Sequence, residues 1–180
     1  IQWQRVSLFR GHTGRGNDVT ISPDGSLIAS AGQDGIIRIW NAFDGSLVYT
    51  LPGFQSQSYW SVAVAPRKIA FSSLSLGFRL LLAAAYYSMS GFGNRGEVRV
   101  WRLSDLQLVW EFASSSEWTQ SVSFSPNGMF LAIGGNRIQL WRIDNNSWSL
   151  YRDIEFGWHN DVKFSPDSRF VIGGGGYPGD

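Results

Sequence analysis

The sequence contains no cysteine, so it can form neither a disulfide framework nor a thiolate metal site. Histidine is almost as scarce, with two residues in 180, and a metal ion would need several further ligands. We therefore expect no metal and no cofactor. An excess of one charge is also absent, because 15 basic and 14 acidic residues leave a net charge of +1. Without a basic surplus to neutralise phosphates, we expect no nucleic-acid partner.

A long uninterrupted hydrophobic run is missing too. The most apolar stretch, Ile69–Tyr87, is broken by Arg79 and three serines, whereas a spanning helix needs about 18 apolar residues in succession. A phosphate-cradling G-x-x-x-x-G-K-[ST] motif is likewise absent. We expect no membrane partner, and the lack of cysteine favours a cytoplasmic location.

The sequence does contain two short motifs that recur along the chain. The first is an apolar-x-apolar segment that ends in proline, at Val19–Pro23, Val62–Pro66, Val122–Pro126 and Val162–Pro166. The second is an apolar residue followed by tryptophan, at Ile39–Asn41, Val100–Arg102 and Leu140–Arg142. Self-similarity at a regular period indicates a repeat architecture.

The spacing of these motifs measures the repeat. Pro126 and Pro166 are 40 residues apart, and Pro23 and Pro66 are 43 apart, but Pro66 and Pro126 are separated by 60. The second unit therefore carries an insertion of about 18–20 residues. Comparison with the first unit predicts about eleven of them before Leu81 and about seven in the hairpin 84–96.

Within the first unit, period-2 alternation and turn residues predict four strands. These are Asp18–Ser22, Leu27–Ala31, Ile36–Trp40 and Leu47–Leu51, with turns at Pro23–Gly25, Asp34–Gly35 and Asp44–Gly45. Four strands in about 40 residues leave no room for a helix, and this pattern is typical of four-stranded propeller blades.

At these residues the chain resembles the WD40 repeat family. The first unit carries the resemblance through Gly11–His12, Ser22–Gly25, Asp34 and Ile39–Asn41, the third through Phe124–Gly128 and Leu140–Arg142, and the fourth through Phe164–Asp167. The resemblance implies an all-β, WD40-like β-propeller with about four partial or complete blades of four antiparallel strands. We expect these blades to be a segment of a larger propeller of about seven blades.

We expect residues 1–180 to form a single propeller segment that is divided into blades. The expected parts are the last strand of a preceding blade at 1–10, a first blade at 11–52, a second at 53–112 with the insertion at about 67–96, a third at 113–154 and an incomplete fourth at 155–180. Such a segment leaves two open sheet edges. A monomer with a sharp cooperative melt would argue against this interpretation.

The resemblance also implies a buried hydrogen-bond tetrad in the first blade, formed by His12, Ser30, Asp34 and Trp40. A His, a Ser and an Asp could suggest a hydrolase, but no nucleophile elbow or oxyanion loop accompanies them. We expect a structural role, no catalytic residue and no enzymatic activity. The other units depart from the pattern, with Gln55, Ser115 and Glu155 in place of His12, so their blades should depend on apolar packing.

In the family, residues just before each first strand form a rim around the central channel. The corresponding partner-binding candidates are Arg15, Trp118 and Trp158, and, two positions further on, Asn17, Trp60, Gln120 and Asn160. Tryptophan and arginine are over-represented at binding hot spots. The alternative, that the indoles pack between blades, remains open. We expect His159 to be exposed at the mouth of a first strand.

The sequence therefore predicts a non-catalytic WD-repeat scaffold that binds a protein or peptide partner through the rim and the insertion of the second blade. The alternative is a regulatory propeller within a larger signalling enzyme, for instance a kinase, whose catalytic domain lies outside this chain. Either way the repeat serves as a frame and function depends on its surface.

Overall fold

The computed structural model describes residues 9–51, 66–71, 81–90, 93–113, 119–144, 147–154, 157, 159 and 161–175, without the side chains of 66–71, 86–90, 93–95 and 113. These residues form β-strands joined by turns, so the expected all-β class is confirmed. Among them no helix is long and apolar enough to cross a membrane.

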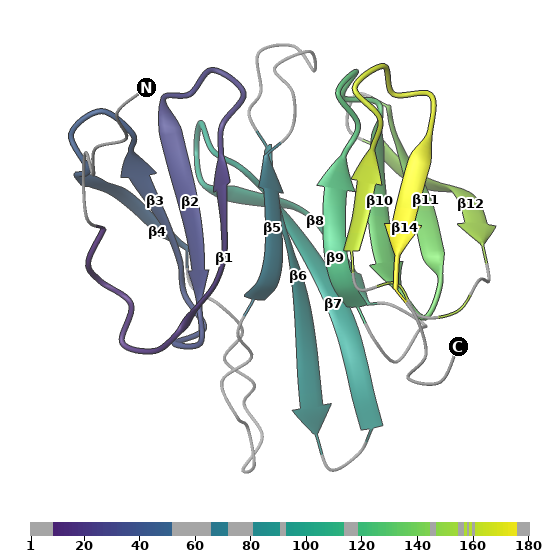
Figure 1. Cartoon of the computed structure of the whole chain (residues 1–180), viewed down its shortest axis with the longest axis horizontal. Coiled ribbons are helices and arrows are strands. Elements are labelled where there is room, and N and C mark those ends of the chain that lie inside the picture. The colour runs from purple at the N-terminus through teal and green to yellow at the C-terminus, as the bar shows by residue number, and fades with distance from the viewer. Residues whose placement is uncertain are drawn as a thin grey trace.

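The strands form three four-stranded antiparallel sheets and a hairpin, each in chain order (Figure 1). The first sheet contains β1 (Gly16–Ile21), β2 (Leu27–Gly32), β3 (Ile37–Asn41) and β4 (Leu47–Leu51). The second contains β5 (Pro66–Phe71), β6 (Leu81–Ser90), β7 (Gly93–Arg102) and β8 (Gln107–Ala113). The third contains β9 (Thr119–Phe124), β10 (Phe130–Gly135), β11 (Ile138–Asp144) and β12 (Ser147–Ile154), and the hairpin pairs β13 (Asp161–Phe164) with β14 (Val171–Gly174).

The first strands of neighbouring sheets lie side by side. β5 contacts both β1 and β9, and β9 also contacts β13. The Ser121 hydroxyl donates to Asp161 Oδ1 at 2.6 Å near the starts of β9 and β13. The backbone N–H of Asn127 donates to Ser168 Oγ at 2.9 Å in the turns that follow these strands. Because both ends are matched in this way, β9 and β13 run parallel, with their sheets fanning outward (Figure 1).

The recurring Ser-Pro motif builds the turn after each described first strand except β5. In the first sheet, the Ser22 hydroxyl donates to Asp24 Oδ1 at 2.6 Å and accepts from the Leu27 N–H at 2.9 Å. Gly25 then adopts a φ of 73°, which glycine tolerates best. The same bonds recur in the sets Ser125, Asn127, Phe130 and Ser165, Asp167, Phe170. The motif is therefore explained by turn chemistry.

The core lies between the sheets. Ala29, Ala31, Ile37, Ile39 and Leu51 of the first sheet pack against Leu82, Ala84, Trp101 and Leu103 of the second. A second cluster joins the second and third sheets, and a third cluster joins Ala132 and Ile138 to Val162 of the hairpin. Neighbouring sheets therefore bury the apolar faces that they turn toward each other.

Strand pairing corrects the expected first strand of the second unit. Leu82 lies opposite Trp101 and Phe71 opposite Leu82, whereas in the first sheet Ile28 lies opposite Trp40 and Ile21 opposite Ile28. Phe71 thus matches Ile21, and the expectation of a strand that ends at Pro66 is wrong. Pro66 instead begins β5, a position where its missing N–H costs no ladder bond.

The pairing also redistributes the inserted residues. Phe71 and Leu82 are 11 positions apart, against 7 for Ile21 and Ile28. Four extra residues therefore lie between β5 and β6, rather than about eleven before Leu81. Leu82 and Trp101, paired across the β6–β7 hairpin, are 19 positions apart, whereas Ile28 and Trp40 in the first sheet are 12 apart. The hairpin therefore contains seven extra residues, as expected.

Candidate interaction surface and the hydrogen-bond network beneath it

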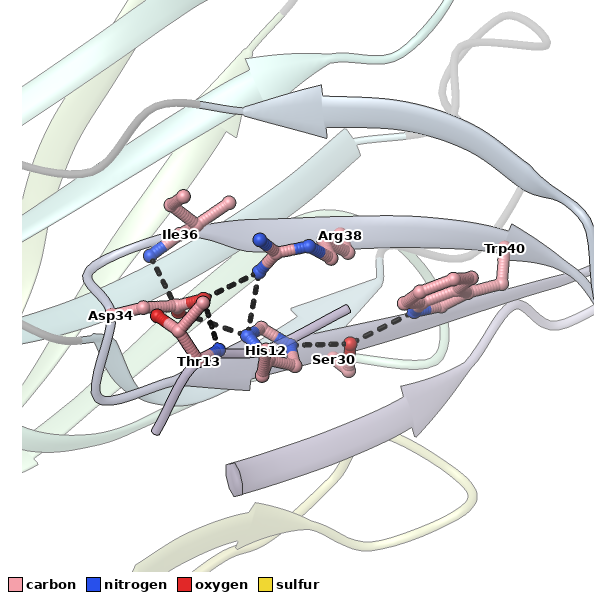
Figure 2. A network of polar contacts seen from close by, with 7 residues as sticks. All are labelled: His12, Thr13, Ser30, Asp34, Ile36, Arg38 and Trp40. Carbon is pink, nitrogen blue, oxygen red and sulfur yellow. Dashed lines mark hydrogen bonds and ion pairs between the residues drawn. The ribbon is translucent and has the colours of Figure 1, made fainter. Parts of the chain in front are cut away.

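The structure brings His12, Ser30, Asp34 and Trp40 together in the first sheet (Figure 2). The indole N–H of Trp40 donates to Ser30 Oγ at 2.8 Å. Ser30 Oγ lies 2.8 Å from His12 Nε2, and His12 Nδ1 lies 2.9 Å from Asp34 Oδ1. Trp40 is a donor only, so the Ser30 proton is available to Nε2 and the imidazole proton on Nδ1 reaches Asp34. The four groups satisfy one another in a largely buried setting.

Asp34 is the acceptor on which this network converges. Arg38 Nη1 donates to Asp34 Oδ2 at 2.7 Å, and the backbone N–H groups of Thr13 and Ile36 also donate to the carboxylate. Burial by itself raises the pKa of Asp34, but the hydrogen bonds from His12, Arg38 and the two backbone groups outweigh it and lower that pKa to about 2. The carboxylate is therefore ionised at neutral pH.

Two further residues belong to this network, and sequence reasoning missed both. Arg38 lies four positions after Asp34 in β3 and belongs to the network through its ion pair with Asp34 at 2.7 Å, beside the His12 ring. Gly32 leaves the space that the imidazole occupies, because a β-carbon there would overlap His12 Nδ1. The sequence signal for the Arg38–Asp34 ion pair is an arginine in the strand that directly follows the Asp34-Gly35 turn.

The geometry favours a structural role for the His, Ser and Asp. Ser30 Oγ is held between the Trp40 indole and the His12 ring, so its lone pairs face protein groups rather than a substrate. Within the described part of the chain, no three His, Cys, Asp or Glu side chains gather to hold a metal ion.

The third sheet lacks this network. Ile133 takes the position of Ser30, because it pairs with Gln139 of β11 and Val122 of β9 as Ser30 pairs with its neighbours in the first sheet. The indole N–H of Trp141, which matches that of Trp40, is buried and has no partner. In the second sheet Ala84 takes the position of Ser30. The residues expected in place of His12, namely Gln55, Ser115 and Glu155, lie outside the described residues.

An aromatic cluster joins the outer parts of the second and third sheets instead. The ring of Trp110 in β8 stacks on that of Trp148 in β12, with centroids 4.7 Å apart and planes at 17°. Trp110 also contacts Phe112 and Trp141 at 5.6 and 5.1 Å. Aromatic pairs of this geometry contribute about 0.5–1.5 kcal/mol each beyond burial.

The rim residues that are described lie at the starts of first strands. Arg15 is exposed directly before β1, and its carbonyl accepts from the Gln33 N–H at 2.9 Å. Asn17 is exposed within β1, and Gln120 is half-buried within β9. Arg15 thus presents a solvated side chain from a fixed backbone.

The other rim candidates, Trp60, Trp118, Trp158 and Asn160, lie outside the described residues. The strand register corrects the alignment from which the Trp60 prediction was made, while the location of Trp60 itself stays a prediction. Arg67, not Trp60, is the second residue of its first strand, as Asn17 is in β1. The sequence alignment counted back from Pro66, and it therefore chose a residue seven positions before Arg67 as the equivalent of Asn17.

His159 differs from its expected exposure. Both ring nitrogens are buried and lack a hydrogen-bond partner, while its backbone N–H donates to the Gly135 carbonyl at 2.8 Å. The ring lies against Gly173, where a β-carbon would come within 2.6 Å of Nδ1. His159 is therefore half-buried, with its ring nitrogens covered beside Gly173 of β14, rather than fully exposed.

Fan-shaped stacking of four-stranded meanders, with one sheet tied by a His–Ser–Asp–Trp network, defines a β-propeller-type protein. The family described as "WD domain, G-beta repeat" matches residues 3–41. This match falls on the first unit, whose motifs carry the resemblance to WD40 repeats, and it covers less than a quarter of the chain.

Several known proteins are similar to parts of the chain. The small ribosomal subunit protein RACK1 of Caenorhabditis elegans is 45% identical over 67 residues, which are 33% of this chain and 21% of that protein. RACK1 of Glycine max is 32% identical over 107 residues, covering 52% and 33%, and RACK1 of Candida albicans is 39% identical over 74 residues, covering 37% and 23%. The matches thus span at most a third of these relatives.

A solved structure shows the same fold over most of the chain. It is described as "Crystal Structure of Mitotic Checkpoint Complex", and one of its chains superposes with a TM-score of 0.69 at 20% identity. The superposition covers 89% of this chain and 46% of the other.

Proposed function

We propose that this chain is a non-catalytic, cytoplasmic protein–protein interaction scaffold. A protein or peptide partner binds across the rim at the starts of the first strands, through Arg15, Asn17, Trp118, Gln120, Trp158 and Asn160, and contacts the insertion of the second sheet. The described surface suits a protein partner, and no nucleic acid, membrane, metal or cofactor enters the proposal.

The main support is the fixed backbone beneath an exposed, charged rim residue. Arg15 is held through its carbonyl beside Gln33, while its guanidinium remains in solvent. The starts of β9 and β13 are joined by the Ser121–Asp161 hydrogen bond, so neighbouring rim positions are held together. A rigid frame with exposed polar and aromatic groups lowers the entropy lost on binding.

The relatives add a second line of support. RACK1 proteins carry the name of a ribosomal subunit protein, and the structural neighbour belongs to a checkpoint complex. Both are components of protein assemblies, as expected for a fold that supplies surfaces rather than reactive groups.

The test compares proteins that co-purify from cells with the wild-type chain and with Trp118→Ala and Trp158→Ala. Truncating a central aromatic hot spot costs about 2 kcal/mol or more, so partners should be depleted at least tenfold. Leu108→Lys, on the outer strand β8, is the control and should retain the same partners.

Melting temperatures separate this account from the packing alternative. We expect both tryptophan variants to melt within a few degrees of the wild type. If they lose partners and stability together, the indoles pack between sheets and the rim proposal fails.

A further inference from the structure

Among the described strands, the outer edge of the first sheet is unpaired and carries apolar side chains. β4 pairs with β3 and is the last strand in the order of its sheet. Leu47, Val48 and Tyr49 are all exposed, and Leu47 reaches 50%. An irregularity between Ile39 and Trp40 places Leu47 and Tyr49 on opposite faces of the sheet. Both faces of this edge are therefore apolar.

The other outer strands carry charges that β4 lacks. β8 contains Glu111, which accepts from Arg99 Nε at 2.7 Å. β12 contains Arg152 and Asp153, and Asp153 accepts from Arg137 at 2.9 Å. β4 reads Leu-Val-Tyr-Thr-Leu and contains no charged residue. Charged side chains on edge strands discourage pairing with other chains, so the first sheet alone among the three leaves its described edge open to pairing.

A rigid aromatic residue stands at the start of this edge. Phe43, in the β3–β4 turn, is 78% exposed. Its backbone N–H donates to Asn41 Oδ1 at 2.8 Å, and the Gly45 N–H donates to the Asn41 carbonyl at 3.0 Å. The matching turn of the second sheet has Ser104 at this position. Phe43 is thus held in solvent by a fixed turn, as an anchor for an apolar group.

The length of β4 indicates which kind of partner can bind to this edge. A strand of five residues extends about 17 Å. A stable contact between folded proteins buries about 800 Å² on each partner, which is more than an edge of this length supplies. The unpaired backbone groups are instead matched by another extended backbone, so a short peptide fits better than a second copy of the chain.

We propose that β4 binds an extended peptide segment of a partner protein, which adds to the first sheet as a fifth strand. Backbone hydrogen bonds provide the affinity, and successive side chains of the peptide, which point to opposite faces, contact Leu47 on one face and Tyr49 on the other. Phe43 contacts an apolar residue at one end. This site lies on the circumference of the sheets, separate from the rim proposed above.

The test uses a labelled octapeptide of alternating threonine and valine with lysine at both ends. Its valines are N-methylated, so it keeps one hydrogen-bonding edge and can pair with no more than one other strand. A twin methylated at the threonines as well has no such edge. We expect saturable binding of the first peptide by fluorescence anisotropy and no binding of the twin.

Two matched variants locate the site. Leu47 lies opposite Trp40 and Leu108 lies opposite Trp101, and Leu108 is 45% exposed. Leu47→Lys should weaken peptide binding at least tenfold, whereas Leu108→Lys should leave it unchanged. Hydrogen exchange should slow in residues 47–51 on binding, and Trp118→Ala should have no effect, which separates this site from the rim.

Several results would overturn the proposal. These are no saturable binding, equal binding of the fully methylated twin, equal loss in both lysine variants, or protection that excludes residues 47–51. Self-association that Leu47→Lys abolishes would assign the edge to a second copy of the chain instead.

Discussion

Asp34 shows how one buried carboxylate organises the first sheet. Its oxygens accept from the His12 ring, the Arg38 guanidinium and backbone N–H groups of Thr13 and Ile36. A buried charge is costly unless it is paired and hydrogen-bonded in this way. The network fixes the segment before β1 against the β2–β3 turn, and so fixes the backbone that carries Arg15.

The lowered pKa of Asp34 predicts how stability depends on pH. The pKa falls from 3.8 to about 2 on folding, so the folded state favours the ionised form. This stabilisation, about 2 kcal/mol, is fully present above pH 4 and is lost as the pH falls toward 2. Chemical denaturation of wild type and Asp34→Asn should therefore differ most near pH 6 and converge near pH 2. A constant difference across this range would contradict the assignment.

Two equivalent tryptophans should differ in how much stability is lost when the indole N–H is removed. The Trp40 N–H donates to Ser30, while the Trp141 N–H is buried without a partner. Trp40→Phe should reduce the free energy of unfolding by about 1–2 kcal/mol more than Trp141→Phe, because only the first change breaks a buried hydrogen bond. Urea denaturation of the two variants measures this difference, and equal losses would mean that the network contributes no stability.

At the scale of strands and turns, the sequence predicted what local chemistry determines. The Ser-Pro turns, the four-stranded units and the residues around His12 are local patterns with few alternatives. The second unit was misregistered because Pro66 follows an apolar-x-apolar segment, as proline does in the other units. The matching part of the strand is Ile69–Phe71, and it is followed by Ser72-Ser73 where the other units have Ser-Pro. Arg38 and the Trp110–Trp148 stack depend on contacts between strands or sheets, which spacing alone does not reveal.

The aromatic cluster holds the outer strands of the second and third sheets together, where the polar network of the first sheet is absent. Trp110→Ala removes the ring contacts to Trp148, Phe112 and Trp141, and should cost about 3 kcal/mol. Tyr49 is the matched control, because it lies opposite Ile39 in the first sheet as Trp110 lies opposite Val100 in the second. Tyr49 is exposed, so Tyr49→Ala should reduce the free energy of unfolding by at most about 1 kcal/mol. Differential scanning calorimetry distinguishes the two. Similar melting temperatures for both variants would show that the cluster does not join the sheets.

At the scale of the whole molecule, the stacking of sheets leaves the first sheet with an uncovered face. Val122 of β9 is 1% exposed because the second sheet covers it, whereas Val19, at the same position of β1, is 64% exposed. Ile21, two positions further along β1, is 60% exposed on the same face. We interpret this face as a site for another sheet of the same kind, consistent with the expectation of a larger propeller.

This interpretation predicts that the 180-residue chain associates in solution through its uncovered apolar face. Sedimentation velocity should show concentration-dependent species that Ile21→Lys reduces, because the lysine places a charge on that face. Phe43→Lys, a change at an exposed apolar residue in the β3–β4 turn, is the control for this face and should leave the association intact. A wild-type monomer with a sharp cooperative melt would contradict the interpretation.

The most direct test of the scaffold account is hydrogen exchange of the chain alone and in complex with the protein that co-purifies with it. The account predicts slowed exchange at the starts of the first strands, in residues 15–17, 118–120 and 158–160. Slowed exchange that excludes these three segments would contradict it.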